Sequence, residues 1–254
     1  MSSIISQVRL GVDVGGSSVK AGLVDSAGGR LMSELVSAPT PALSTPEAVM
    51  SVVADLARRL PRSTGPVGLS FPSVVKDGRV RTAANISTSW LEIDGAALAS
   101  QVLGRPVVFL NDADAAGLAE MRLGAGRGVM GPVVMLTFGT GIGSALFVEG
   151  KLYPNTELGH LEMRGLDAEK YASAHVRTAL SLDWPAWCAR VNEYLARMHA
   201  LLWPDLFIIG GSVTEHFAEF GPLLTSEAQI RGAHFTGQAG VVGAALAASE
   251  GIAR

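Results

Sequence analysis

Cysteine is almost absent from the sequence: Cys188 is the only one among 254 residues. One cysteine can form neither an internal disulfide nor a zinc site of several cysteines, and this usage indicates a reducing cytoplasm. The chain also lacks an uninterrupted run of about 20 apolar residues, so we expect no membrane-spanning helix. Residues 1–7 have neither a cationic flank nor a long apolar stretch, so we expect no secretory signal.

Charged residues are also few. They make up 17% of the chain, against 48% hydrophobic residues, which argues against disorder. The formal net charge is −3, so bulk electrostatics gives no reason to expect binding to nucleic acid. The length is enough for a well-buried core and for one large or two modest domains.

Glycine is abundant instead, with 30 residues, and two glycine-rich turns lie between apolar runs. Residues 15–17 separate the apolar runs 8–14 and 19–25, and residues 139–143 lie within a predicted hairpin over 133–148. Glycine lets backbone N–H groups approach an anion, and nests of such groups bind phosphate. Two turns can hold a phosphate chain from two sides, although Gly-Gly and Gly-Ser are also ordinary hairpin signals.

An acidic turn follows the apolar run 107–110. Asn111 and Asp112 precede a predicted helix over 113–124. A carboxylate there can remove the proton of an attacking hydroxyl, and the rest of phosphoryl transfer is positioning and charge stabilisation. The plainer interpretation is that Asp112 or Asp114 caps the helix.

Hydrophobic periodicity predicts an α/β chain whose two halves begin alike, each with a strand–turn–strand segment. Further strands are expected at 31–37, 67–71, 107–110 and 207–209, and helices from Pro46 to about Leu60 and at 94–103, 113–124, 168–180, 185–202 and 240–249. Two α/β lobes with a cleft between them fit this order best. We expect a smaller lobe over 1–110 and a larger one over 111–254, with the last helix packing back on the first lobe.

Five short motifs occur in a fixed order along the chain. They are Asp13-Val-Gly-Gly, Asn111-Asp112, Phe138-Gly-Thr-Gly-Ile-Gly, Glu157-Leu-Gly-His160 and Ile209-Gly-Gly-Ser-Val. This ordered set resembles the ROK family of sugar kinases, and residues 82–90, 159–165 and 204–211 are most similar to its polyphosphate glucokinases. The resemblance implies a two-lobed actin-like ATPase (ribonuclease H-like) fold with a central cleft.

Two departures from the family pattern bear on the metal and the phosphoryl donor. Most ROK members have a cysteine-rich zinc motif after Glu-x-Gly-His, whereas residues 161–175 contain no cysteine, as in the polyphosphate branch. We therefore predict no structural zinc. The polyphosphate glucokinases usually have lysines after the Gly-Gly-x-Val turn, but this chain has Thr214-Glu215-His216. An extended polyanion needs a basic track, so this loss argues against tight polyphosphate binding. Lys20, Arg122 and Arg127 are candidates to line a polyphosphate path, with solvated surface residues as the alternative.

The resemblance also implies roles for individual residues. Asp112 would be the general base, and Asp13 would hold Mg²⁺ through water or merely stabilise its turn. A pyranose offers hydroxyls that amides, carboxylates and imidazole can bind. The sugar ligands would be Asn85, Asn111, Asp112, Glu157, His160 and Glu169. The phosphate-binding residues would be Gly15, Gly16, Ser17, Lys20, Thr137, Gly139, Thr140, Gly141, Gly143, Gly210 and Gly211. Ordinary surface or turn roles remain the alternative, above all for His160 and for Gly210-Gly211.

The predicted reaction is phosphorylation of the 6-hydroxyl of glucose with inorganic polyphosphate or ATP as the donor and Mg²⁺ as cofactor. One alternative is an ATP-dependent kinase of another hexose, such as mannose or an N-acetylated amino sugar. A non-catalytic sugar sensor is a second, although a first strand from about Val8 leaves no room for a helix-turn-helix. A dehydrogenase is disfavoured because both glycine turns lead into strands. By resemblance we expect a homodimer, and we expect the apolar stripe of 185–202 to be core.

Overall fold

The computed structural model describes residues 7–252 and divides into two compact units. The first runs to Ala119 and resumes at Gln238, and the second is Glu120–Gly237. This division falls within helix α4 (Asp112–Leu123), whereas the sequence placed the boundary near residue 110. The expectation of no secretory signal concerns residues 1–7, which apart from Gln7 lie outside the described part of the chain.

The first unit is built on a mixed sheet with the strand order β3-β2-β1-β5-β8, and β4 also pairs with β2. The glycine turn joins β1 (Val8–Val14) to its antiparallel neighbour β2 (Ser18–Asp25), while β5 (Val67–Phe71) and β8 (Val107–Asn111) continue the sheet in parallel. Because parallel strands end at the same edge, the carboxyl ends of β1, β5 and β8 lie together. The short strands are β3 (Arg30–Leu31), β4 (Val36–Pro39), β6 (Val75–Lys76) and β7 (Arg79–Val80).

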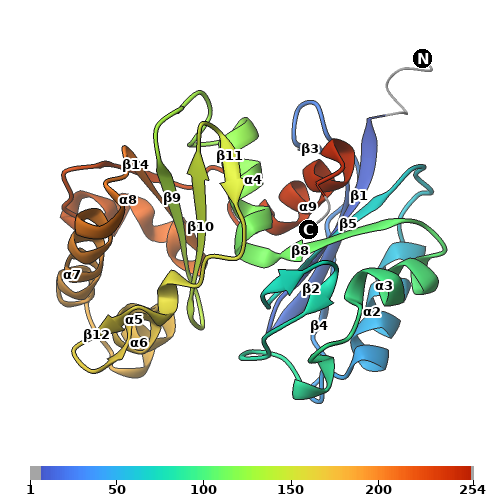
Figure 1. Ribbon diagram of the computed structural model, residues 1–254, viewed down its shortest axis with the longest axis horizontal. Coiled ribbons are helices and arrows are strands. Elements are labelled where there is room, and N and C mark those ends of the chain that lie inside the picture. The colour runs from blue at the N-terminus through green and yellow to red at the C-terminus, as the bar shows by residue number, and fades with distance from the viewer. Residues whose placement is uncertain (1–6, 253–254) are drawn as a thin grey trace. The chain divides into compact units, whose positions relative to one another are not determined.

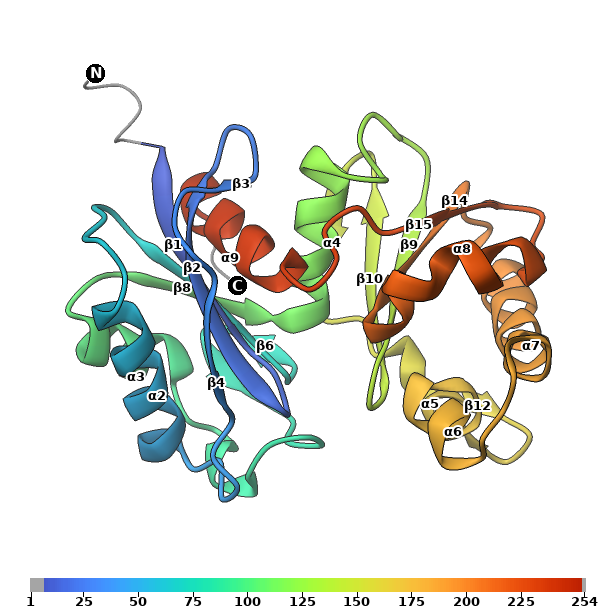
Figure 2. The ribbon, with the colours of Figure 1, turned by 180° about the vertical axis from the view of Figure 1, so that it is seen from behind.

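Helices cover both faces of this sheet (Figures 1 and 2). One face packs with α2 (Pro46–Arg58) and α3 (Gly95–Leu103) into a hydrophobic core that also holds Trp90 of the 3₁₀ turn η1 (Thr88–Trp90). The other face carries α9 (Ala239–Glu250), which lies so close that a Cβ on Gly11 would stand 2.0 Å from the carbonyl oxygen of Val241. Only glycine allows this approach, so Gly11 lets α9 lie directly against the sheet.

The second unit repeats this plan, as the sequence predicted. Its sheet has the order β11-β10-β9-β14-β15, in which an antiparallel hairpin is extended by parallel strands beside its first strand. The strands are β9 (Val133–Phe138), β10 (Ile142–Val148), β11 (Lys151–Tyr153), β14 (Leu206–Gly211) and β15 (Gln229–Gly232). The short strands β12 (Glu162–Met163) and β13 (Leu166–Asp167) form a separate ribbon.

Helix α7 (Trp184–Leu202) supplies a large part of the core of the second unit. It starts where the Asp183 carboxylate accepts the N–H of Ala186, with Pro185 in the first turn. The predicted apolar stripe is buried at Trp187, Val191, Tyr194, Leu195 and Met198 and packs on β9 and β14, whereas Leu201 is 57% exposed. The stripe is therefore core except at its last turn. The remaining helices and turns are η2 (Leu158–His160), α5 (Ala168–Ala172), α6 (Ala174–Ala179), η3 (Ser212–His216), α8 (Phe217–Phe220) and η4 (Gly221–Leu223).

Two predicted elements are wrong in detail. The strand expected at 31–37 is two strands, because the hydroxyl of Ser33 takes the N–H of Leu23 (3.0 Å) that a continuous ladder would bind. The helix expected at 168–180 breaks at Ser173, whose backbone is extended and whose hydroxyl accepts the N–H of Val176 to start α6. Both are local competitions between a serine side chain and the backbone.

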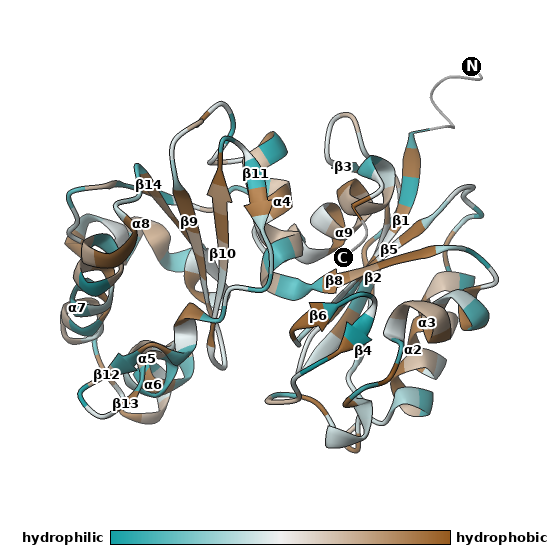
Figure 3. Cartoon of the chain, in the orientation of Figure 1, coloured by the Kyte–Doolittle hydropathy of each residue, from teal (hydrophilic) through white to brown (hydrophobic). Residues whose placement is uncertain are grey.

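Hydrophobic residues concentrate in the central strands of both sheets (Figure 3). This concentration explains the positive mean hydropathy without any membrane segment, and no helix within residues 7–252 is long and apolar enough to cross a membrane. Cys188 is buried in the core of the second unit, and burial raises the pKa of its thiol to about 11. The thiol therefore stays protonated at neutral pH.

Candidate functional site

Asp13 lies near the carboxyl end of β1, on the face that carries α9. The Ser70 hydroxyl donates a 2.7 Å hydrogen bond to Oδ1 of Asp13. On β2, Lys20 is the register partner of Asp13. Burial raises the pKa of Asp13, while the hydrogen bond from Ser70 and the charge of Lys20 act in the opposite direction. A Cβ on Gly240 would lie 2.5 Å from the Asp13 carboxyl carbon, so the carboxylate touches the first turn of α9.

The first glycine turn is a tight hairpin whose tip is exposed. The Gly15 N–H donates to the carbonyl of Ser18 (2.9 Å), and the Thr40 hydroxyl donates to the carbonyl of Gly15 (2.6 Å). Neither Gly15 nor Gly16 has a positive φ, so the backbone conformation does not itself require glycine. The exposed residues at the tip are Gly16 and Ser17. Because the Gly15 N–H already donates to Ser18, Gly16 and Ser17 are the residues of this turn for which phosphate binding stays predicted.

Asn111 and Asp112 connect β8 to α4. The Asn111 side chain caps the helix: its Oδ1 accepts the N–H of Asp114 at 3.0 Å, and its Nδ2 donates to the carbonyl of Ser73 at 3.1 Å. The capping interpretation therefore applies to Asn111 rather than to Asp112 or Asp114. Asp112 is half-buried, and its Oδ1 accepts the N–H of Ala113 at 2.8 Å. Its carboxylate is thereby held at the edge where β1 and β5 also end.

Asn85 lies on an exposed loop before η1. The loop approaches the first glycine turn, because a Cβ on Gly16 would lie 3.6 Å from the carbonyl oxygen of Asn85. The loop is anchored behind this point by Ser44, whose hydroxyl accepts the N–H of Ser87 and whose carbonyl accepts Nε1 of Trp90. The first unit therefore brings Asn85 and the tip of the turn together.

In the second unit, the Glu-x-Gly-His segment is fixed on β10. A Cβ on Gly159 would lie 2.1 Å from the carbonyl oxygen of Ile142, so only glycine fits there. The Ser144 hydroxyl accepts the N–H of Leu158 (3.0 Å), and Tyr194 of α7 donates to the carbonyl of Leu158 (3.0 Å). These contacts hold Leu158 and Gly159, the two residues that lie between Glu157 and His160 in sequence.

Glu157, His160 and Glu169 form one electrostatic cluster. Nε2 of His160 lies 3.5 Å from Oε2 of Glu157. Burial raises the pKa of Glu157, His160 lowers it, and the charge of Glu169 raises it again. The three residues named as sugar ligands in this half of the sequence are thus neighbours in the fold, although Glu169 comes from α5.

Glu169 also faces the second glycine turn. A Cβ on Gly141 would stand 2.2 Å from its Oε2, which accepts the Ile142 N–H at 3.4 Å. The turn is closed by the Gly139 N–H, which donates to the carbonyl of Gly141 (3.0 Å). Thr140 is its exposed tip. The negative charge of Glu169 beside this turn would repel a bound phosphate chain unless a cation lay between them.

Gly210 and Gly211 end β14 directly beside the second turn, with Thr137 and Phe138 as their register partners. Gly211 has φ +89°, and a Cβ there would lie 2.3 Å from the carbonyl oxygen of Phe138. Only glycine allows this backbone to leave the sheet so close to its neighbour. The register therefore gathers the second group of predicted phosphate-binding residues, including Gly143 opposite Thr137, at one edge of the sheet.

The segment after Gly211 carries no lysine. The Thr214 hydroxyl donates to the carbonyl of Gly211 (2.7 Å), and Nδ1 of His216 lies 2.8 Å from Oε1 of Glu219. Of the other cations proposed for a polyphosphate path, Arg122 donates to the carbonyl of Gly150 (2.9 Å) and Arg127 is exposed. The local charge balance of 214–219 is therefore not cationic.

One group of side chains among the described residues has metal-ligand geometry. Atoms of His160, Asp167 and Glu169 lie within 4.8 Å of one another. However, Nζ of Lys170 lies 2.8 Å from Oδ2 of Asp167 and already balances that carboxylate. A divalent cation would have to displace this lysine, and the expectation of no structural zinc stays a prediction.

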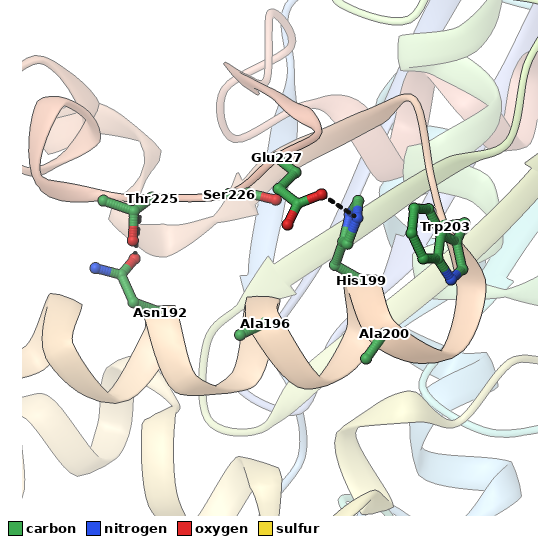
Figure 4. A pocket seen from close by; sticks show the side chains of 8 residues that line it. All are labelled: Asn192, Ala196, His199, Ala200, Trp203, Thr225, Ser226 and Glu227. Carbon is green, nitrogen blue, oxygen red and sulfur yellow. Dashed lines mark hydrogen bonds and ion pairs between the residues drawn. The ribbon is translucent and has the colours of Figure 1, made fainter.

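A cavity of about 520 Å³ lies elsewhere in the second unit, between the last turns of α7 and residues 225–227 (Figure 4). At one end of it, Nε2 of His199 is 3.4 Å from Oε2 of Glu227 and the exposed Trp203 lies beside His199, while Asn192 and Thr225 lie at the other end. None of the predicted sugar or phosphate ligands lines this cavity.

Sequence reasoning missed several residues that position the site. Ser70 carried a signal, since it is a polar residue inside the buried strand 67–71. Ser144 and Tyr194 carried a weaker one, as polar groups on otherwise apolar strand and helix faces. Gly240 carried none, because its contact with Asp13 joins residues that are far apart in sequence.

Comparison with known proteins decides the family. A family model described as ROK matches residues 9–177. The chain belongs to the ROK family. It is 43% identical over 238 residues to the polyphosphate glucokinase of Mycobacterium tuberculosis (strain ATCC 25618 / H37Rv), covering 93% of this chain and 89% of that protein.

Solved structures of ROK proteins have the same fold. The inorganic polyphosphate/ATP-glucomannokinase of Arthrobacter sp. strain KM superposes with a TM-score of 0.93 at 44% identity, covering 96% of this chain and 99% of that one. A ROK family glucokinase from Streptomyces griseus, in complex with glucose and AMPPNP, gives 0.79 at 26% identity, with 96% and 99% covered. This ROK chain therefore has the two-lobed actin-like ATPase fold that its sequence predicted.

Proposed function

We propose that this ROK protein phosphorylates glucose at the 6-hydroxyl with inorganic polyphosphate, and also with ATP. The observation that carries the proposal is the likeness to a polyphosphate glucokinase and to a polyphosphate/ATP-glucomannokinase over at least 93% of the chain. The arrangement of acidic and amide side chains supports it, because carboxylates, amides and imidazole suit a ring of hydroxyls.

Asp112 is the proposed general base. Its carboxylate is fixed at the start of α4 by the Ala113 N–H and stands beside the capping Asn111. In the proposed step Asp112 takes the proton of the 6-hydroxyl while O6 attacks the terminal phosphorus. The bond from that phosphorus to the bridging oxygen breaks, and the shortened polyphosphate or ADP leaves. Such a base typically contributes about 10²–10⁴-fold to the rate.

The sugar is proposed to be held by two sets of residues. Asn111 has one amide hydrogen and one oxygen lone pair beyond its two structural bonds, which suits contacts with ring hydroxyls. Asn85 and the cluster of Glu157, His160 and Glu169 are the other proposed ligands. The mutual contacts within that cluster orient each polar group before a sugar arrives, which limits the entropy lost on binding.

Phosphate is proposed to bind at the two glycine turns, with Mg²⁺ at Asp13. The donor chemistry at Asp13 fits this ion, because Mg²⁺ prefers oxygen ligands and is usually bound by one or two carboxylates and water. Lys20 and the Ser70 hydroxyl already balance part of the charge of Asp13, which favours contact through water. When bound, Mg²⁺ would neutralise negative charge on the donor phosphates.

Mannose as a further substrate is favoured by one specific observation, the 44% identity to a glucomannokinase. Assembly as a homodimer, a cytoplasmic location and the absence of structural zinc stay predictions from the sequence.

The test is an assay of purified protein with glucose and Mg²⁺, offered polyphosphate or ATP separately, in which glucose 6-phosphate is measured. Turnover with polyphosphate supports the proposal. Turnover with ATP alone would show that the protein, which has no lysine at 214–216, does not use polyphosphate as a donor. Absence of product with both donors, in protein that is folded by circular dichroism, would refute the proposed function.

A further inference from the structure

A second cavity, of about 440 Å³, lies in the first unit and combines an apolar wall with arginines. The wall is formed by side chains of α2 and α3, among them Ala54, Ala57 and Leu103. The charged lining residues are Arg58, Arg62 and Arg105, and none of the described residues that line the cavity is Asp or Glu. The cavity therefore has a strongly cationic lining in a protein whose net charge is −3.

The cavity is at the opposite edge of the sheet from the proposed catalytic residues. Its strand residues are Leu10 and Val67, near the amino ends of β1 and β5, whereas Asp13 and Asn111 lie near the carboxyl ends of β1 and β8. A strand advances about 3.3 Å per residue, so the two ends of the five-residue strand β5 are about 13 Å apart. A molecule in this cavity is therefore separate from the groups proposed for phosphoryl transfer.

Arg105 is fixed in place by neutral partners. Its Nε and Nη2 donate to the Gly65 carbonyl at 2.9 and 2.6 Å, and its Nη1 donates to the Ser63 hydroxyl at 3.2 Å. These acceptors orient the guanidinium without cancelling its charge. Burial lowers the pKa of Arg105, and the nearby positive charge of Arg9 lowers it further. An anion in the cavity would relieve that repulsion.

The other two arginines that line the cavity lie at the end of α2 and just after it. Arg58 ends α2 and forms an ion pair with Asp55, a solvent-exposed contact of small net value. Arg62 is exposed, three residues beyond the arginine that caps α2. Arg59, that cap residue, is also exposed but does not line the cavity. The chain therefore offers a matched control one residue away from Arg58.

We propose that this cavity is a binding site for a phosphate oxyanion, distinct from the site of phosphoryl transfer. Guanidinium groups present planar pairs of donors that match phosphate oxygens, and two of them on one anion give charge-assisted bonds. The cavity is within the size range of small-molecule sites, about 300–1,000 Å³, and is larger than one phosphate requires. The ligand is either a segment of an inorganic polyphosphate chain or a phosphate ester whose body contacts the apolar wall.

Calorimetric titration of the full chain with tripolyphosphate, and separately with AMP, tests the proposal. We expect the double variant Arg58→Gln/Arg62→Gln to weaken one class of site at least about tenfold for one of these ligands, as loss of two charge-assisted contacts implies. Arg59→Gln should change the affinity less than about twofold. A loss for tripolyphosphate alone identifies the inorganic chain, and a loss for AMP identifies the ester.

Chemical modification locates the site independently of these variants. Phenylglyoxal modifies arginines, and mass spectrometry of the wild-type protein should show protection of Arg62 and Arg105 by the ligand, with Arg59 unprotected. Equal titrations for the wild type and both variants, or protection of Arg59 alone, would overturn the proposal. Because binding is measured without turnover, a protein that fails to phosphorylate glucose still gives a clear answer here.

Discussion

The hydroxyl of Ser70 and the carboxylate of Asp13 are joined by a 2.7 Å hydrogen bond across the parallel strands β1 and β5. Burial raises the pKa of Asp13, and this bond counteracts the rise. The strand register, set by packing in the first unit, thus limits the rise in the pKa of an acidic group at the sheet edge where Mg²⁺ is proposed to bind.

Ser70→Ala should raise the pKa of Asp13 further. Asp13 is an acid whose pKa is already raised on folding, so its charged form destabilises the fold as pH rises through that pKa, and the variant enlarges this effect at neutral pH. We expect a loss of about 1–3 kcal/mol in the free energy of unfolding at pH 7, as for a lost hydrogen bond to a charged group, and a smaller loss at pH 4. Urea denaturation at both pH values measures this, and an equal loss at both would contradict it.

Gly240→Ala should displace Asp13. The new methyl would lie 2.5 Å from the Asp13 carboxyl carbon, and overpacking of this kind costs about 1–3 kcal/mol. We expect a higher Mg²⁺ concentration for half-maximal activity and a lower kcat. Gly28→Ala is the control, since its methyl would meet only the end of the flexible Asp25 side chain, at 3.3 Å. Unchanged Mg²⁺ dependence in Gly240→Ala would argue against a metal role for Asp13.

His160→Gln should change how glucose binding depends on pH. The charge of His160 lowers the pKa of Glu157, which burial raises, so the variant leaves that pKa higher still. If ionised Glu157 binds glucose, KM should begin to rise at a higher pH in the variant as the solution is acidified. His175→Gln, an exposed histidine of α6, should keep the wild-type profile. Identical acid limbs for wild type and His160→Gln would contradict the proposed coupling.

Glu215→Lys should favour polyphosphate over ATP. Glu215 is exposed in the segment that follows Gly210-Gly211, close to the predicted phosphate-binding edge. Replacing an anion by a cation there should lower KM for polyphosphate up to about fivefold at low salt, as surface charge contacts of up to about 1 kcal/mol imply. The effect should fade with added salt. Glu227→Lys, just before the amino end of β15, is the control. An equal gain in both variants would mean that overall charge, not position, is responsible.

The repeated strand–turn–strand plan was predictable from the sequence because hydrophobic runs and glycine turns are local signals. The grouping of Glu157 with His160 followed from one short motif, and Glu169 joined them as the resemblance implied. The contact of Asp13 with Gly240 was not predictable, since it depends on how α9 crosses β1. The break at Ser173 was missed for a different reason: a side-chain cap overrode helical periodicity.

The cap of α4 is a second feature that the sequence pattern did not determine. The sequence indicated an Asn-Asp pair at a strand end but did not show which residue caps α4. The structure gives the cap to Asn111, whose Oδ1 accepts the Asp114 N–H, whereas Oδ1 of Asp112 accepts the N–H of Ala113. That division of roles supports the proposal that Asp112 is the base.

The kcat of Asp112→Asn with polyphosphate, glucose and Mg²⁺ tests the central claim most directly. The amide preserves the size of the side chain and can still contact a hydroxyl, but it cannot take up a proton at neutral pH. We predict a fall of at least about 10²-fold in kcat, with glucose KM and the thermal midpoint close to those of the wild type. A variant that keeps wild-type kcat would contradict the assignment of Asp112 as the general base.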